Sequence, residues 1–150
     1  MANDNCKSRL LNLLAMLRAV QIVHHTAHWQ TQGSTFYGDH LLFERLYSAL
    51  GDEFDTLAEK IVAMHGPTAV DAVDQMQRIA TVVKRATESE KDLSKRSLLL
   101  EEGLQTVLEA VRDYLRKENE LSIGLDNFLQ GLADSHETAV YLLKQRTAKG

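Results

Sequence analysis

Four long stretches of the chain repeat apolar residues at the three- and four-residue spacing of an amphipathic helix, and little in the sequence can interrupt them. The 150 residues include one proline and eight glycines, and the clearest breaks fall at Gly33 and at Gly66–Pro67. Because glycine and proline end helices, this pattern favours long helices over many short strands. The expected helices cover approximately residues 8–32, 36–64, 90–119 and 122–147, with a shorter one over 70–80.

The connection between the second and third long helices determines the predicted topology. It is long enough to cross a bundle and contains the short helix, so the two helices that it joins can run parallel. We therefore predict an all-α protein, a ferritin-like four-helix bundle with a long crossover that carries a short extra helix. Residues 8–150 would form this domain, and residues 1–7 would form a polar, flexible leader.

Composition argues against several classes of function. The net charge is −4, and lysine and arginine are dispersed, so no basic arm predicts nucleic-acid binding. The sequence has no apolar run long enough for a membrane helix, and its start does not resemble a signal peptide. The lone Cys6 cannot form an intramolecular disulfide. Together these features predict a cytoplasmic protein.

The second predicted helix carries an unusual stripe of titratable side chains. His40 and Glu44 are four residues apart, as are Asp55 and Glu59, so the members of each pair are neighbours on one helix face. Eleven residues separate Glu44 from Asp55, which is close to three turns, and both pairs therefore face the same way. A helix that only packs in a bundle would fill this stripe with leucine and alanine.

The distance between the two pairs decides how they could bind a metal. At about 1.5 Å per residue, Glu44 and Asp55 are roughly 16 Å apart along the helix axis, whereas metal ligands lie about 2 Å from the ion. One ion therefore cannot contact both pairs of a single chain. An antiparallel two-fold pairing of two copies of this helix would bring the first pair of one chain to the second pair of the other, giving two equivalent sites per dimer.

Two further residues fit such a pairing. Its centre would fall near Gly51, which costs about 1 kcal/mol in a helix interior and so indicates a close approach of two backbones. His28, at the end of the first helix, can add a second imidazole. Taken singly, a charged pair is usually a solvated face, and a histidine on an apolar stripe is usually a satisfied core residue. Spacing alone leaves both interpretations open.

The same residues resemble a known family. The match consists of His28–Trp29, Gly33, Phe36, His40, Glu44 and the run DTLAEKI from Asp55. This motif, strongest over residues 27–61, resembles the Dps family of miniferritins, and the helix order fits nearly the whole chain. The resemblance implies a homo-oligomeric shell of twelve subunits, built from two-fold dimers. Such a shell would bind Fe(II), oxidise it, preferentially with hydrogen peroxide, and store ferric mineral.

The resemblance also implies a role for each matching residue. Each ferroxidase centre would hold two irons between His28, His40 and Glu44 of one subunit and Asp55 and Glu59 of its partner. Glu59 would be a bridging or principal ligand, with His28 and Asp55 as direct or water-mediated ligands. His40 and Glu44 would form the second iron position, and Trp29 would lie nearby as a possible electron donor. Many members have aspartate in place of Glu44, so we expect a different geometry there.

Two alternatives compete with this ferroxidase, and the ligand types leave zinc or manganese open. The first is a DNA-compacting protein of the same fold. Members that bind DNA often use a lysine-rich terminal extension, which this chain lacks, so the resemblance leaves DNA binding unsupported. The second is a structural shell protein with an inactive metal site, and the intact set of five ligands argues against it.

Four histidines, at positions 24, 25, 65 and 136, lie outside the motif. We interpret His24 as a core or interface residue, since no HExxH pattern accompanies it. His25 points to another part of the helix surface and receives no role. Ferritins with sites inside each bundle rely on Glu-x-x-His pairs, and none occurs here. We therefore interpret His136 as a structural or surface residue.

Overall fold

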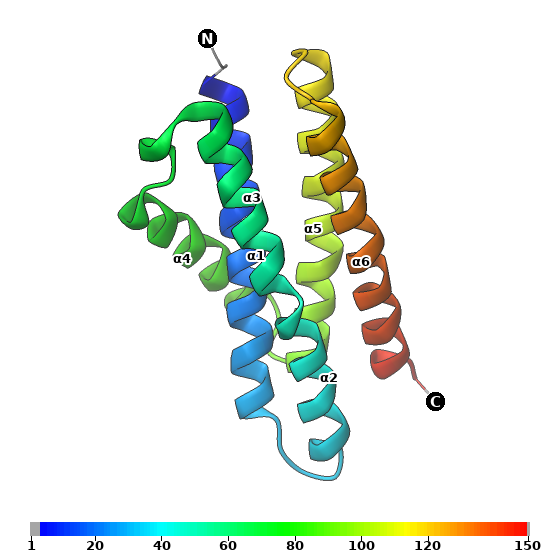
Figure 1. Cartoon of the computed structure of the whole chain (residues 1–150). Coiled ribbons are helices and arrows are strands. Elements are labelled where there is room, and N and C mark those ends of the chain that lie inside the picture. The colour runs from blue at the N-terminus through cyan, green and yellow to red at the C-terminus, as the bar shows by residue number, and fades with distance from the viewer. Residues whose placement is uncertain (1–3, 150) are drawn as a thin grey trace.

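The computed structural model describes residues 4–149, which form a bundle of helices without a strand (Figure 1). The predicted ferritin-like four-helix bundle is confirmed, and its four arms are α1, the pair α2 and α3, α5 and α6. The elements are α1 Asp4–Gln30, α2 Phe36–Ser48, α3 Leu50–His65, the short 3-10 helix η1 Pro67–Ala69, α4 Ala72–Ser89, α5 Leu93–Lys117 and α6 Ile123–Thr147.

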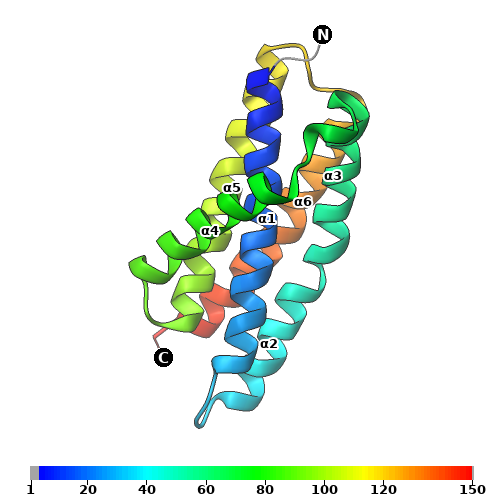
Figure 2. The same cartoon turned by 90° about the vertical axis from the view of Figure 1, so that its left-hand side faces the viewer.

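The long crossover joins two parallel arms of the bundle, as its length predicted. The arm formed by α2 and α3 runs parallel to α5, and α4 crosses the outside of the bundle between them (Figures 1 and 2). α1 is the central arm, since it packs against α2, α3, α4 and α5, while α6 packs mainly against α5. None of the helices in residues 4–149 is both long and apolar enough to cross a membrane.

The core consists of the apolar stripes that the periodicity indicated. Leu10, Leu14 and Leu17 on α1 are at most 1% exposed, and Leu104 and Leu115 on α5 are fully buried. Burying a leucine side chain stabilises a fold by about 1.5–3 kcal/mol relative to leaving it exposed. These contacts orient each helix, and so they also determine which side chains of α2 and α3 remain on the outside.

α1 begins earlier than we predicted. The helix starts at Asp4 rather than at residue 8, because Cys6 is buried and extends the apolar stripe of Leu10 by one more turn. The expected flexible leader is therefore helical from Asp4 onward, and residues 1–3 of that leader lie outside the described part of the chain.

The second long helix is interrupted at Ala49, which separates α2 from α3. The hydroxyl of Ser48 donates to the carbonyl of Glu44 at 2.6 Å, and such bonds bend helices. Gly51 follows with its low helix propensity. A Cβ added at Gly51 would meet no atom within 4 Å, so nothing within residues 4–149 requires a glycine there. The close approach to a second chain stays a prediction.

Two other boundaries differ from the prediction by three residues or more. α4 continues to Ser89 rather than ending at residue 80, because Val82, Val83 and Ala86 extend its apolar face against the core. α5 begins at Leu93 rather than at residue 90, because the carboxylate of Asp92 caps the helix by accepting the backbone N–H of Lys95.

Candidate metal centre

The end of α1 and the first half of α2 place His28 and His40 against each other. Their rings stack with centroids 3.6 Å apart. Nδ1 of each ring lies 2.7 Å from the backbone carbonyl oxygen of the other residue. A carbonyl only accepts, so Nδ1 carries the proton in both rings. In the neutral imidazole, each Nε2 then keeps its lone pair, which is the form that binds a metal.

An ion pair between the buried Asp39 and the partly exposed Arg146 holds the backbone beside His40. Asp39 is 6% exposed and accepts two hydrogen bonds from Arg146 of α6, at 2.5 and 2.8 Å, and one from Thr35 at 2.9 Å. The hydrogen bond from Arg146 outweighs burial and lowers the pKa of Asp39. The last turn of α6 is thereby joined to the first turn of α2, from which His40 projects.

The three predicted carboxylate ligands are exposed. Glu44 lies one turn from His40 on α2, and Asp55 and Glu59 are one turn apart on α3. None of these three carboxylates makes an ion pair or side-chain hydrogen bond with another residue of the described chain. In residues 4–149, no three or more His, Cys, Asp or Glu side chains are grouped so that they could hold one metal ion. A site that joins all five residues therefore needs a second chain and stays a prediction.

An aromatic cluster adjoins the two histidines. His25 stacks on Tyr47 with ring centroids 4.0 Å apart, and it lies 4.2 Å from Trp29. Its centroid is 6.1 Å from that of His28, and Tyr47 meets His28 edge-on at 5.3 Å. His25 was assigned no role from its sequence position, although its four-residue spacing from Trp29 indicated a shared helix face. The structure adds His25 and Tyr47 to the surroundings of His28.

A second titratable cluster lies inside the bundle, where four helices each contribute one side chain. Glu101 of α5 accepts from Nε2 of His24 on α1 at 2.8 Å and from Nδ1 of His136 on α6 at 2.6 Å. Nε2 of His136 donates to Glu53 of α3 at 2.6 Å. The two nitrogens of His136 thus serve different carboxylates. The cluster is a chain of charge-assisted hydrogen bonds that ties the four arms together.

The hydrogen bonds of this cluster determine the charges of Glu101 and His136. Burial raises the pKa of Glu101, but hydrogen bonds from His136 and His24 outweigh it and lower the pKa to about 2. Burial lowers the pKa of His136, but hydrogen bonds to Glu101 and Glu53 raise it to about 10. At neutral pH, a charged His136 therefore lies between two carboxylates.

The interpretation of His24 as a core residue and of His136 as a structural one is confirmed, since they are 0% and 3% exposed. Glu53 and Glu101 were not among the residues predicted to be functional. A signal was present for Glu101, because it lies on the same helical stripe as the buried Ser97 and Leu104.

The helix order, the parallel second and third arms and the crossover helix define a ferritin-like four-helix bundle. Solved structures share this fold. Dps from Thermosynechococcus elongatus matches with a TM-score of 0.82 and 22% sequence identity over 98% of this chain and 92% of that one. A Dps protein from Vibrio cholerae O1, described as a member of a broad superfamily of ferritin-like diiron-carboxylate proteins, matches with a TM-score of 0.79 and 17% identity over 97% and 90% of the two chains.

Sequence comparison gives the same group. The "DNA protection during starvation protein" of Brevibacillus brevis is 25% identical over 141 residues, which cover 89% of this chain and 85% of that protein. No family model matches the chain. The resemblance to the Dps family that the histidine and carboxylate motif indicated is therefore confirmed, in sequence and in fold.

Proposed function

We propose that the chain binds Fe(II) at centres shared between two subunits, oxidises it there, and stores the ferric product in a hollow homo-oligomer. The observation that carries this proposal is the pair of hydrogen bonds between His28 and His40. Each bond occupies Nδ1 with a backbone carbonyl and leaves Nε2 as the ligand atom. A backbone carbonyl is one of the usual orienting partners of a metal-binding histidine.

The chemistry of the five residues suits Fe(II). Imidazole nitrogen and carboxylate oxygen are ligands that Fe(II) accepts, and mixed sites of this type leave positions open for an oxidant. His28, His40 and Glu44 would come from one subunit. Asp55 and Glu59 of the partner would complete the centre, and both are exposed in the single chain, so a two-fold partner can reach them.

A centre with two irons explains why hydrogen peroxide would be a suitable oxidant. Reducing one peroxide to two waters consumes two electrons and two protons, and each Fe(II) gives one electron as it becomes Fe(III). The O–O bond then breaks in a two-electron step that releases no hydroxyl radical. The preference for peroxide, the ferroxidase activity and the two irons per centre all rest on the resemblance to the Dps family.

The assembly and the cellular setting are proposed on the same resemblance. They comprise a shell of twelve subunits, built from two-fold dimers, in the cytoplasm. Direct DNA binding is not part of the proposal, although the name of the Brevibacillus brevis relative refers to DNA protection. The chain has a net charge of −4, and Arg146 of its short basic tail is already paired with Asp39.

Anaerobic titration with Fe(II), followed by substoichiometric peroxide, tests the proposal. Ferric absorbance should rise rapidly, with two irons oxidised per peroxide. The double variant Asp55→Ala, Glu59→Ala should lose this phase. A control of equal charge change, Asp134→Ala with Glu137→Ala, removes two exposed carboxylates of α6 and should retain it. Oxidation no faster than that of free iron in buffer would refute the proposal.

A further inference from the structure

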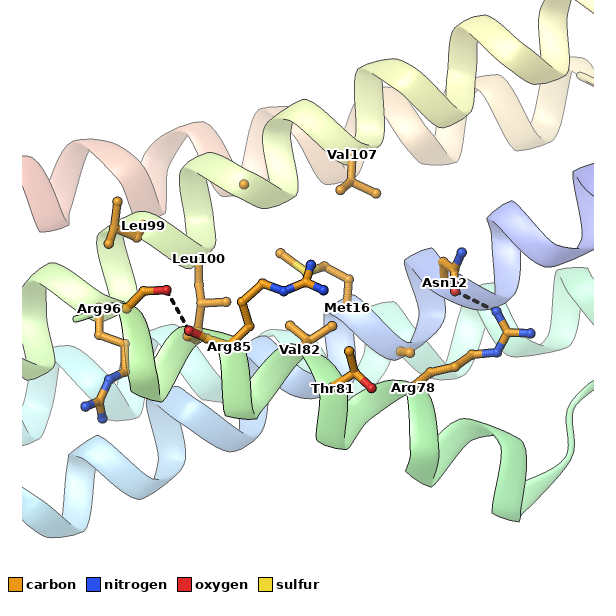
Figure 3. A pocket seen from close by; sticks show the side chains of 14 residues that line it. Asn12, Met16, Arg78, Thr81, Val82, Arg85, Arg96, Leu99, Leu100 and Val107 are labelled. Carbon is orange, nitrogen blue, oxygen red and sulfur yellow. Dashed lines mark hydrogen bonds between the residues drawn. The ribbon is translucent and has the colours of Figure 1, made fainter. Parts of the chain in front are cut away.

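A groove lies where the crossover helix α4 passes over α1 and α5. It has a volume of about 830 Å³, and Figure 3 shows the 14 residues that line it. Ligand pockets in proteins typically have volumes of about 300–1,000 Å³. The groove is separate from the candidate metal centre, because none of the five predicted ligands or their aromatic neighbours lines it.

The walls of the groove are largely apolar. Met16 of α1, Val82 of α4 and Leu100 of α5 contribute aliphatic side chains, and Leu99 is 52% exposed beside them. Gly103 leaves the α5 wall open. A Cβ at that position would stand 3.6 Å from the terminal methyl of Met16, so any larger side chain would project into the space.

The charged residues that line the groove are of one sign. Its lining includes three arginines and no carboxylate, in a chain whose net charge is −4. Arg78 is held by Asp74 and Asn12, and Nε of Arg96 donates to the backbone carbonyl of Glu90 at 2.7 Å.

Arg85 differs from the other two arginines. Its guanidinium makes no hydrogen bond or ion pair with a residue in the described part of the chain. Figure 3 shows its side chain extending along the groove toward Met16, beside Leu100 and Val82. An unpaired cation therefore lies directly beside apolar side chains.

We propose that this groove binds an anionic amphiphile of the long-chain carboxylate class, such as a fatty acid. The alkyl chain would lie along the apolar walls, and the carboxylate would pair with Arg85 in a charge-assisted, two-pronged geometry. A simple anion would not use the apolar walls, and a neutral hydrocarbon would leave Arg85 unpaired. Between Arg78 and Ser89, α4 offers a wall roughly 16 Å long, which suits an extended chain.

Calorimetric titration of the assembled protein with dodecanoate, below its micellar concentration, tests this inference. We expect saturable binding of one dodecanoate per chain. Dodecanol, which has the chain without the charge, should bind about tenfold more weakly, and acetate, which has the charge without the chain, should not bind measurably.

Three variants locate the binding. Arg85→Gln should weaken dodecanoate binding about tenfold, and Gly103→Leu should weaken it by at least as much, because the leucine side chain would project into the groove from the α5 wall. Lys84→Gln is the matched control, since it removes one positive charge from the neighbouring exposed position of α4, outside the groove, and should bind as the wild type does. Thermal melts would confirm that each variant is folded.

Two outcomes would overturn the inference. One is the absence of saturable dodecanoate binding, which is also the result expected if a neighbouring subunit covers the groove. The other is equal affinity in the wild type, Arg85→Gln and Gly103→Leu, which would place any bound dodecanoate elsewhere. Neither outcome bears on the iron chemistry, because the groove shares no residue with the candidate metal centre.

Discussion

His28 and His40 orient each other, because Nδ1 of each imidazole donates a hydrogen bond to the backbone carbonyl of the other residue at 2.7 Å. The two rings also stack. Both rings are therefore fixed before any metal binds. When neighbouring hydrogen bonds already hold the ligand side chains, less conformational entropy is lost as the metal binds, and the affinity is higher.

Replacing His40 by alanine should weaken Fe(II) binding by at least about tenfold, since outer hydrogen-bond partners alone are worth 10–100-fold in affinity and this change removes a ligand as well. Anaerobic calorimetric titration measures the effect. His65→Ala serves as a control, because His65 lies at the far end of α3. Unchanged Fe(II) affinity in His40→Ala would show that the stacked pair is only structural.

The buried chain of hydrogen bonds should contribute strongly to stability. Glu101→Gln should lower the free energy of unfolding by about 3–5 kcal/mol, the usual effect of breaking a buried ion pair, because a neutral amide would face the charged His136. Urea denaturation measures it. Glu102→Gln changes the exposed neighbour and should stay within about 0.5 kcal/mol of the wild type. Equal effects of the two substitutions would contradict a stabilising role for the buried hydrogen bonds of Glu101.

The same buried chain of hydrogen bonds predicts how the free energy of unfolding depends on pH. Glu101 has a folded pKa of about 2 against a usual 4.5, so its stabilisation is present above pH 4.5 and is lost as the pH falls toward 2. His136 has a folded pKa of about 10 against a usual 6.5, so its stabilisation is present below pH 6.5 and is lost as the pH rises through 10. The joint contribution is therefore largest between pH 4.5 and 6.5.

Urea midpoints measured from pH 3 to pH 10 would check this dependence, with wild type and Glu101→Gln compared at each pH. The difference in unfolding free energy between the two proteins should shrink at both ends of the range. A difference that stays constant from pH 3 to pH 10 would be incompatible with an ion-paired chain.

The pair of Asp39 and Arg146 should hold the end of α6 in place. Asp39→Asn removes the charge that Arg146 contacts, and the last turn of α6 should then fray. Because the side chain of Arg146 is 37% exposed, the expected loss is modest, about 1 kcal/mol. Amide hydrogen exchange would detect faster exchange in residues 143–147 and little change in α5. Unchanged exchange there would mean that packing alone holds this turn.

The fold could be predicted because its information is local. Apolar residues such as Leu10, Leu14 and Leu17 repeat at helical spacing, and few residues break the pattern, so both the helices and the long crossover follow. The interruption at Ala49 could not be predicted in the same way. The hydroxyl of Ser48 donates to the carbonyl of Glu44 there, but Thr106 makes the same bond inside the uninterrupted α5, so neither this bond nor the periodicity predicts the break.

The surroundings of the candidate site could be predicted only in part. His28 and His40 were predicted as ligands, but their mutual hydrogen bonds depend on how the turn after α1 folds back. Glu101 and His136 are 35 residues apart in sequence, and their contact depends on the rotation of α5 relative to α6. Periodicity shows which face of a helix is buried, but not which side chains meet across the bundle.

The central claim, a centre built from two chains, is tested most directly by mixing two inactive variants. One carries His40→Ala with Glu44→Ala, and the other carries Asp55→Ala with Glu59→Ala. A mixed dimer would contain one centre that lacks all four residues and one intact centre, because the intact pairs of the two chains would face each other.

The measurement is the rate of peroxide-driven Fe(II) oxidation after the two variants are unfolded together and reassembled. Each variant alone should be inactive, and the reassembled mixture should recover part of the wild-type rate, up to about half per mixed dimer given one intact centre of two. A mixture as inactive as its components, although mixed assemblies form, would contradict the shared centre.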